Sequence, residues 1–494
     1  MKRIFVFLCI MTLLFSIISG CGNPASDMSG DASDFEAGNT PDSEVESTPH
    51  IDTGRSQDEY TQDLEWVIEL PDLLLNNFEP DPAQTGELNI FLMNDPYQMM
   101  LTPVIDLYRK IYPNVELKIE HAGGDNTAYN TRLSTELMAG KGPDLFFPGN
   151  LYETTDIMKL AETGIFADLN EFIESDDSFD IDAYIKPVMD GGILNGKRYL
   201  IPITYMINNL LIFSKPALPS KLDEIGFDKT KMNDPTSFVS EIVRTLPKAQ
   251  ETAGFKFMYN TNLLFSVLKT SGIKLFDTET KEILPEEEHF ERLIKAYKPY
   301  YQYDSAWIGE EAERNTDYLA VSLDMSGGKV MFTNAQFTPV FIWKASSLKR
   351  LGGYELHAMP NIHGNNPVRS AQLVAVGGNS PNKQNAWNFI KLMLSPENQS
   401  RDFSIGPVHR DSVVYSFKSW YEGPGQDNDS AKLSNDEVNA YISMYTNVDT
   451  VSYFETPFHW NFIFNHLEAY FKDEIGYEEA VARIKSDLRF YLSE

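Results

Sequence analysis

The spacing of hydrophobic and polar residues changes twice between positions 88 and 120. Residues 88–93 form a short apolar run with strand character. Apolar residues then recur at helical spacing over 102–111, with Thr102 as the expected N-cap and Pro103 as the first helical residue. Residues 115–120 alternate between apolar and charged side chains, as a strand does. This strand–helix–strand order predicts that the two strands pair in parallel.

The same alternation of strands and helices continues along the chain. A helix over 130–139, closed by Gly140 and Gly142, is followed by a strand over 144–147. Later elements are expected as strands at 354–359 and 371–376, a helix from Ser380-Pro381 to Leu394, and a closing amphipathic helix over 481–492. No internal repeat of fixed period is present. The pattern therefore predicts an α/β body.

The N-terminus has the pattern of an export signal. Lys2 and Arg3 precede an apolar stretch, 4–18, which is shorter than the about 20 residues of a membrane span. The stretch ends in Ile18-Ser19-Gly20-Cys21, which resembles the bacterial lipobox. That resemblance implies a lipoprotein signal peptide over 1–20 and lipidation of Cys21. The lipid would then be the only membrane anchor, on the extracellular face of the cell membrane.

The segment after the cysteine contains almost no large apolar residue. Residues 21–59 are rich in Ser, Asp, Glu, Gly, Thr and Pro, and we expect a disordered acidic tether there. Residues 60–86 are more apolar and form a connecting segment of uncertain structure. The chain has two cysteines, Cys9 and Cys21, so removal of the signal would leave one thiol and no disulfide.

Length and charge narrow the possible classes of protein. The 494 residues suit two lobes rather than one core. The net charge of −31 disfavours nucleic acid and anionic lipid headgroups as partners. No phosphate-binding loop, dinucleotide fingerprint or zinc spacing is present, so we expect neither cofactor nor metal. The acid-rich run 174–182 lacks the glycine and terminal glutamate of an EF-hand and is predicted to be a solvated turn.

Several short motifs occur in a characteristic order from about Leu88 to the C-terminus. They are Gly142-Pro143-Asp144-Leu145, residues 164–169, Asn195-Gly196-Lys197-Arg198-Tyr199-Leu200-Ile201-Pro202, Gly328-Lys329-Val330-Met331, Gly377-Gly378-Asn379-Ser380-Pro381 and Gly406-Pro407-Val408-His409-Arg410. In this order and spacing the chain resembles the family 1 extracellular solute-binding proteins, the group that includes maltose-binding protein. The family's usual tyrosine–asparagine pair is replaced here by Asn208-Asn209 or Phe213-Ser214.

The resemblance implies a periplasmic-binding-protein-like fold: two α/β lobes joined by a hinge (type II). Lobe 1 would comprise 87–203 and 370–412, and lobe 2 would comprise 204–369 and 413–494. The chain would cross between them near Ile203, Arg369 and Ser412. Hinge closure would trap a ligand in the cleft, and the subunits of an ABC permease would recognise the closed form. We expect a monomer.

The resemblance also places candidate ligand contacts. A sugar offers apolar faces that stack on aromatic rings and hydroxyls that need hydrogen-bond partners. The candidates are Asn94, Asp95, Asn150, Tyr152, Tyr205, Phe265, Phe337 and Trp343. Phe265 and Phe337 are alternatively core residues, and Asp95 is alternatively a turn residue before Pro96.

The function implied by the resemblance is capture of a small polar ligand without chemistry. A carbohydrate, in particular an oligosaccharide, is favoured, while peptide, polyamine or another polyol stay open. Two other functions stay open as well. A secreted carbohydrate-active enzyme would use a pair of its 72 acidic residues. A sensing subunit would present its closed lobes to a receptor kinase.

Overall fold

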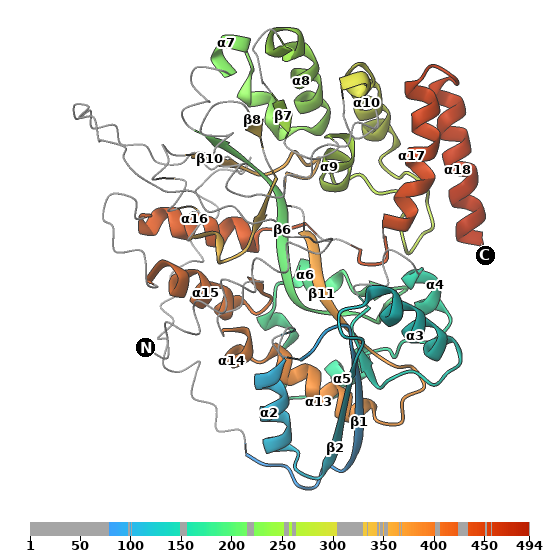
Figure 1. The fold of residues 1–494 in the computed structure, drawn as a ribbon, viewed down its shortest axis with the longest axis vertical. Helices are drawn as coiled ribbons and strands as arrows, with labels where there is room; N and C mark the ends of the chain where they lie inside the picture. The colour runs from blue at the N-terminus through green and yellow to red at the C-terminus, as the bar shows by residue number, and fades with distance from the viewer. Residues whose placement is uncertain are drawn as a thin grey trace, which may run out of the picture.

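The computed structural model describes residues 79–494 with interruptions (Figure 1). The positions left out are 97–98, 100, 149–155, 215–221, 251–255, 259–262, 304–329, 333, 343–344, 346–348, 350–353, 365, 367, 401–405, 423–432, 450–451, 456 and 494. The signal peptide, Cys21, the tether and most of the connecting segment lie outside the described residues. Within them, no helix combines the length and apolar character needed to cross a membrane.

One lobe, here lobe 1, is built on the strands that the sequence pattern predicts first. Strand β1 (Gly86–Leu92) pairs in parallel with β2 (Val115–His121), placing Ile90 opposite Ile119, and also in parallel with β3 (Leu145–Phe146). The predicted parallel pairing is confirmed. Ile90 and Phe91 are both buried and enter different apolar clusters, so the sheet is covered on both faces.

Two helices of lobe 1 begin elsewhere than the sequence suggested. Helix α2 (Thr102–Ile111) has Leu101 at its N-cap, so Thr102 lies inside the helix and makes no side-chain cap. Helix α3 (Asn126–Met138) begins before position 130 because the side chain of Asp125 accepts a hydrogen bond from the Ala128 N–H at 2.9 Å. A cap outside the apolar repeat therefore lengthens the helix.

The G-P-D motif of residues 142–144 has a structural role. Asp144 is buried and accepts hydrogen bonds from the Asn89 N–H at 2.7 Å and from the Ser380 hydroxyl at 2.5 Å. The Asn382 side-chain amide donates to the same carboxylate at 3.2 Å. Asp144 thus joins β1 to the turn before α13 (Lys383–Leu394), a helix that begins later than the predicted Pro381.

The acid-rich run 174–182 is only partly the solvated turn that was predicted. Asp176 accepts the Trp387 indole N–H at 2.8 Å and pairs with the Lys391 ammonium at 2.7 Å. Burial alone would raise the pKa of Asp176, but the hydrogen bonds from Lys391, Ser178 and Trp387 outweigh it and hold the pKa at about 2.

A pair of long strands connects the two lobes. Strands β6 (Ile201–Ser214) and β11 (Val368–Val376) run side by side through the middle of the molecule (Figure 1) and pair antiparallel. The main sheet runs in the order β10-β6-β11-β3-β1-β2, in which β10 is Tyr354–His357. Two of the three expected crossings, near Ile203 and Arg369, fall on this strand pair.

Most of the second lobe, here lobe 2, is helical. It holds α8 (Pro235–Gln250), α10 (Glu287–Tyr297), α17 (Pro457–Phe471) and α18 (Tyr477–Ser493), drawn in the upper half of Figure 1. Its smaller elements are α7 (Asp223–Ile225), η6 (Lys229–Asn233), β7 (Lys256–Met258), α9 (Leu263–Thr270), η7 (Lys298–Tyr303), β8 (Val330–Phe332) and β9 (Asn334–Phe337). Helix α18 confirms the closing amphipathic helix, with Ile484 and Leu488 buried.

The remaining elements surround the connecting strands or complete lobe 1. Lobe 1 includes α4 (Ile157–Glu162), α5 (Asn170–Ser175), η4 (Ile181–Ala183), α6 (Lys186–Asp190), β4 (Ile193–Leu194) and β5 (Lys197–Arg198). Further along the chain come α14 (Pro396–Gln399), β12 (Gly406–Pro407), which pairs with β6, α15 (Arg410–Glu422) and α16 (Asn435–Thr446). The described apolar core forms two clusters, and each contains residues from both sequence halves.

Candidate functional site

Polar side chains collect where the parallel strands of lobe 1 end. Asn94 and Asp95 follow β1, and His121 ends β2. Gly124 lies against the Asn94 side chain, since a Cβ added to Gly124 would lie only 2.9 Å from the Asn94 Oδ1. The backbone φ of Gly124 is +89°, a conformation that glycine adopts readily. In open α/β sheets, the carboxyl edge of the strands is the usual place for a ligand. This edge is therefore the first part of the candidate site.

Asp95 and His121 are open to solvent at this edge. Their side chains are 54% and 41% exposed, and the His121 Nε2 lies 4.0 Å from an Asp95 carboxylate oxygen. A carboxylate, an imidazole and an amide together provide acceptors and donors that suit hydroxyl groups. The structure places His121, which sequence reasoning did not single out, beside the predicted contact Asp95.

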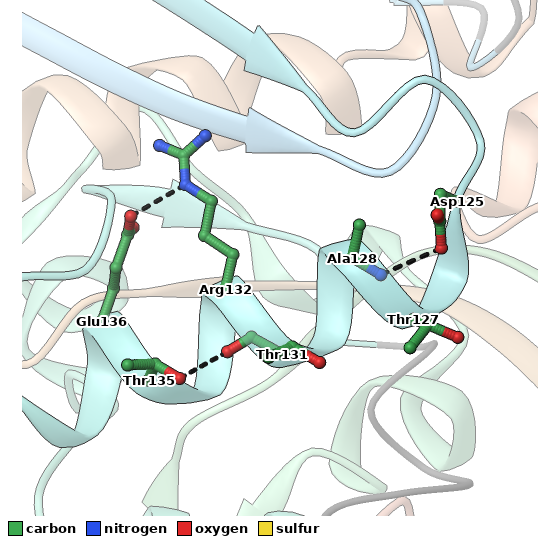
Figure 2. A pocket seen from close by; sticks show the side chains of 7 residues that line it. All are labelled: Asp125, Thr127, Ala128, Thr131, Arg132, Thr135 and Glu136. Atoms are coloured by element: carbon green, nitrogen blue, oxygen red, sulfur yellow. Dashed lines mark hydrogen bonds and ion pairs between the residues drawn. The ribbon is translucent and has the colours of Figure 1, made fainter.

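An open groove runs from the same edge along helix α3 (Figure 2). Its volume is about 530 Å³, and its lining residues are Asp125, Thr127, Ala128, Thr131, Arg132, Thr135 and Glu136. The Arg132 guanidinium lies over the Phe91 ring at 4.3 Å and pairs with Glu136 at 2.8 Å. The groove thus combines threonine hydroxyls with an ion pair.

Tyr205 lies in β6 and is fully buried. Its hydroxyl donates to the Tyr445 carbonyl at 2.6 Å, and the Tyr445 hydroxyl donates to the Tyr205 carbonyl at 2.8 Å. Burial raises the pKa of both phenols well above 10. A ligand would reach the Tyr205 ring only after this reciprocal pair has opened.

The two predicted phenylalanines differ in their surroundings. Phe337 is fully buried, with its ring 5.2 Å from Phe341 and 6.0 Å from Phe417 between centroids. Phe265 is half-buried on α9, 5.7 Å from the Phe464 ring. Phe337 therefore occupies a core position in this conformation, whereas Phe265 is only partly buried.

Three predicted contacts, Asn150, Tyr152 and Trp343, lie outside the described residues. The part of the chain that is described contains no group of three or more His, Cys, Asp or Glu side chains arranged to hold a metal ion.

The lobes meet at a charged contact that the sequence did not signal. We call it the rim contact and define it as Asp156, Lys159 and Glu162 of lobe 1 with Lys281 and Tyr491 of lobe 2. The Lys281 ammonium lies 2.9 Å from a Glu162 carboxylate oxygen, and the Lys159 ammonium lies over the Tyr491 ring at 5.1 Å. Burial raises the pKa of the Tyr491 phenol, and Asp156 adds to that shift.

A second contact between the lobes is buried beside the connecting strands. We call it the pivot contact: Tyr453, from the loop before α17, with Val188 and Gly191 of lobe 1. The Tyr453 hydroxyl donates to the Val188 carbonyl at 3.0 Å, and its N–H donates to the Gly191 carbonyl at 2.9 Å. Two residues along, burial raises the pKa of the Glu455 carboxyl to about 8.

The fold is similar to that of several solved binding proteins. The sugar-binding protein MalE of Xanthomonas citri aligns with a TM-score of 0.56 at 15% identity, over 83% of this chain and 98% of that one. The cyclic α-maltosyl-1,6-maltose binding protein of Arthrobacter globiformis gives a TM-score of 0.54 at 14% identity, over 82% and 98%. The GacH receptor of Streptomyces glaucescens, which was solved unliganded and with acarbose, aligns with a TM-score of 0.50 at 17% identity, over 83% of this chain and 99% of that one.

These identities are low, so the structures establish the fold alone. In a search of curated protein sequences, none matches the chain. The sequence model of the bacterial extracellular solute-binding proteins matches residues 95–400, which is more than half of the chain. Together with the two-lobed fold, this match shows that the chain belongs to the bacterial extracellular solute-binding protein family.

Proposed function

We propose that this protein captures a carbohydrate, in particular an oligosaccharide, between its lobes and delivers it to an ABC permease. The match of residues 95–400 to the solute-binding family carries the proposal. The carbohydrate is supported by the similar structures, which include a sugar-binding protein and a receptor solved with acarbose. The protein binds its ligand as a monomer and does not cleave it.

The ligand contacts begin at the carboxyl edge of lobe 1. Asn94, Asp95 and His121 bind sugar hydroxyls there, and closure of lobe 2 completes the cleft. Phe265 supplies a stacking surface from lobe 2, since this residue is only partly buried. Lobe 1 comprises 87–203 and 370–412, and lobe 2 comprises 204–369 and 413–494.

A lipid on Cys21 holds the protein at the extracellular face of the membrane. The support is the sequence Ile18-Ser19-Gly20-Cys21 after an apolar segment. Metabolic labelling with palmitate tests the anchor: the wild-type chain becomes labelled and sediments with membranes, while Cys21→Ala does neither. An unlabelled wild-type chain would contradict it.

Calorimetric titration with maltose, maltotriose, maltohexaose and a cyclic oligosaccharide tests the ligand. We expect saturable binding of at least one of them, with dissociation constants in a range near 1 µM that corresponds to about 8 kcal/mol. Chromatography of the recovered sugar separates binding from cleavage. Unchanged sugar supports transport, products support the enzyme alternative, and no binding to any saccharide overturns the carbohydrate proposal.

A further inference from the structure

Lys281 is presented to lobe 1 by a short hairpin of lobe 2. Asp277 and Glu282 close the turn through a backbone hydrogen bond of 2.8 Å, and the Asp277 side chain accepts the Thr280 N–H at 2.7 Å. Lys281 itself has a φ of +60°, a conformation that glycine or asparagine adopts more easily than lysine. A lysine kept in a strained position suggests that its side chain has a use there.

The side chain reaches across to helix α4 of the other lobe. Lys281 and Glu162 are 2.9 Å apart, and their side chains are only 32% and 28% exposed. Lys159 also lies near Glu162, at 3.9 Å, so one carboxylate serves two ammonium groups. An ion pair that is mostly shielded from solvent is less screened than a fully exposed one.

The ion pair lies beside apolar residues of both lobes that belong to one cluster. The buried residues of α4, including Ile157 and Ala161, belong to one continuous apolar cluster with Phe276 and Tyr491 of lobe 2. The Phe276 and Tyr491 rings flank His459, at 5.0 Å and 4.8 Å between centroids. Separation of the lobes here would expose apolar surface and leave Glu162 with one cation fewer.

We propose that the rim contact, centred on Lys281 and Glu162, is a latch that holds the two lobes together before a ligand arrives. This inference rests on the proposed closure of the lobes around a ligand. The latch lowers the cost of closing and so raises ligand affinity, because less binding free energy is spent on moving the lobes. It also slows ligand release, since opening has to break it.

Energy transfer between two dyes measures the latch without any ligand. Cys9 and Cys21 are the only cysteines of the chain. In the full chain with both replaced by serine, Glu171→Cys on α5 and Lys248→Cys on α8 place one dye on an exposed position of each lobe. Single-molecule recording then gives the ratio of closed to open molecules.

The wild-type chain is expected to be mainly closed. Lys281→Glu and Glu162→Lys should each lower the closed-to-open ratio about 5- to 10-fold, because like charges then face each other across the rim. The double exchange K281E/E162K should restore most of it. The matched control is the pair Lys485–Glu287, 2.6 Å apart within lobe 2, whose reversal should leave the ratio unchanged.

Thermal unfolding of every variant shows whether the lobes themselves remain folded. The proposal is overturned if the wild-type chain is mainly open, if single reversals at the rim behave like those of the control pair, or if the double exchange fails to restore closure. The measurement contains no saccharide, so such a failure is separate from a failure of the proposed carbohydrate capture.

Discussion

The pivot contact and the rim contact join the same two lobes with opposite chemistry. At the pivot contact, Tyr453 is 7% exposed and donates two hydrogen bonds to backbone carbonyls of lobe 1. At the rim contact, ammonium and carboxylate groups about one third exposed meet through side chains alone. Buried backbone hydrogen bonds are costly to break, whereas partly solvated ion pairs separate at little cost. The rim contact is therefore the weaker of the two contacts.

Removing the tyrosine at the pivot should have the largest effect. Tyr453→Ala is expected to lower the free energy of unfolding by about 3–5 kcal/mol. The substitution deletes a buried ring and the hydrogen bond from its hydroxyl to the Val188 carbonyl of lobe 1. Urea denaturation measures this loss of stability. Tyr303→Ala is the control, since Tyr303 is 42% exposed, and its loss should change stability by less than about 0.5 kcal/mol. If both substitutions lowered the free energy of unfolding equally, Tyr453 would contribute no more to stability than an exposed surface tyrosine.

The carboxyl group next to the pivot should make stability depend on pH. The pKa of Glu455 is about 8 in the folded chain and ordinarily near 4.5, so the folded state holds the proton more tightly. The contribution of Glu455 to stability is therefore complete below about pH 4.5 and is lost as the pH rises through 8. Glu455→Gln should gain about 1–3 kcal/mol at pH 8 relative to wild type and flatten the dependence between pH 5 and 9. If the free energy of unfolding changed with pH in the same way in wild type and Glu455→Gln, the raised pKa of Glu455 would be refuted.

The smallest change in stability, with a clear change in conformation, is expected at the rim. Lys281→Gly relieves the left-handed backbone and removes the ion pair. Its free energy of unfolding should stay within about 1 kcal/mol of wild type, while the closed-to-open ratio falls about 3- to 5-fold. Denaturation and energy transfer on the same labelled chain check both. Lower stability with an unaltered ratio would mean that Lys281 serves only its own hairpin.

Sequence patterns were informative wherever the physics is local. The apolar alternation in 115–120 and the helical repeat in 102–111 gave β2 and α2 almost residue by residue. The order of strands and helices predicted the parallel pairing of β1 and β2, which the register confirms. Capping was less predictable: Asp125 starts α3 from outside its apolar repeat.

Contacts between distant segments could not be read from the sequence. Lys281 and Glu162 are 119 positions apart, and Asp176 and Trp387 are 211 apart, so no spacing rule relates them. An aromatic residue also gives no local sign of whether it lines a cleft or a core. Tyr205 and Phe337 are fully buried here, while Phe265 is only partly buried, and only packing distinguishes them.

Capture of an uncleaved sugar by lobe closure is tested most directly with the dye-labelled chain. Titration with the saccharide that binds best should convert the remaining open molecules to the closed form with a saturating dependence, and the sugar should be recovered intact. A saccharide that binds without changing the closed-to-open ratio, or that is returned as shorter products, would contradict this mechanism.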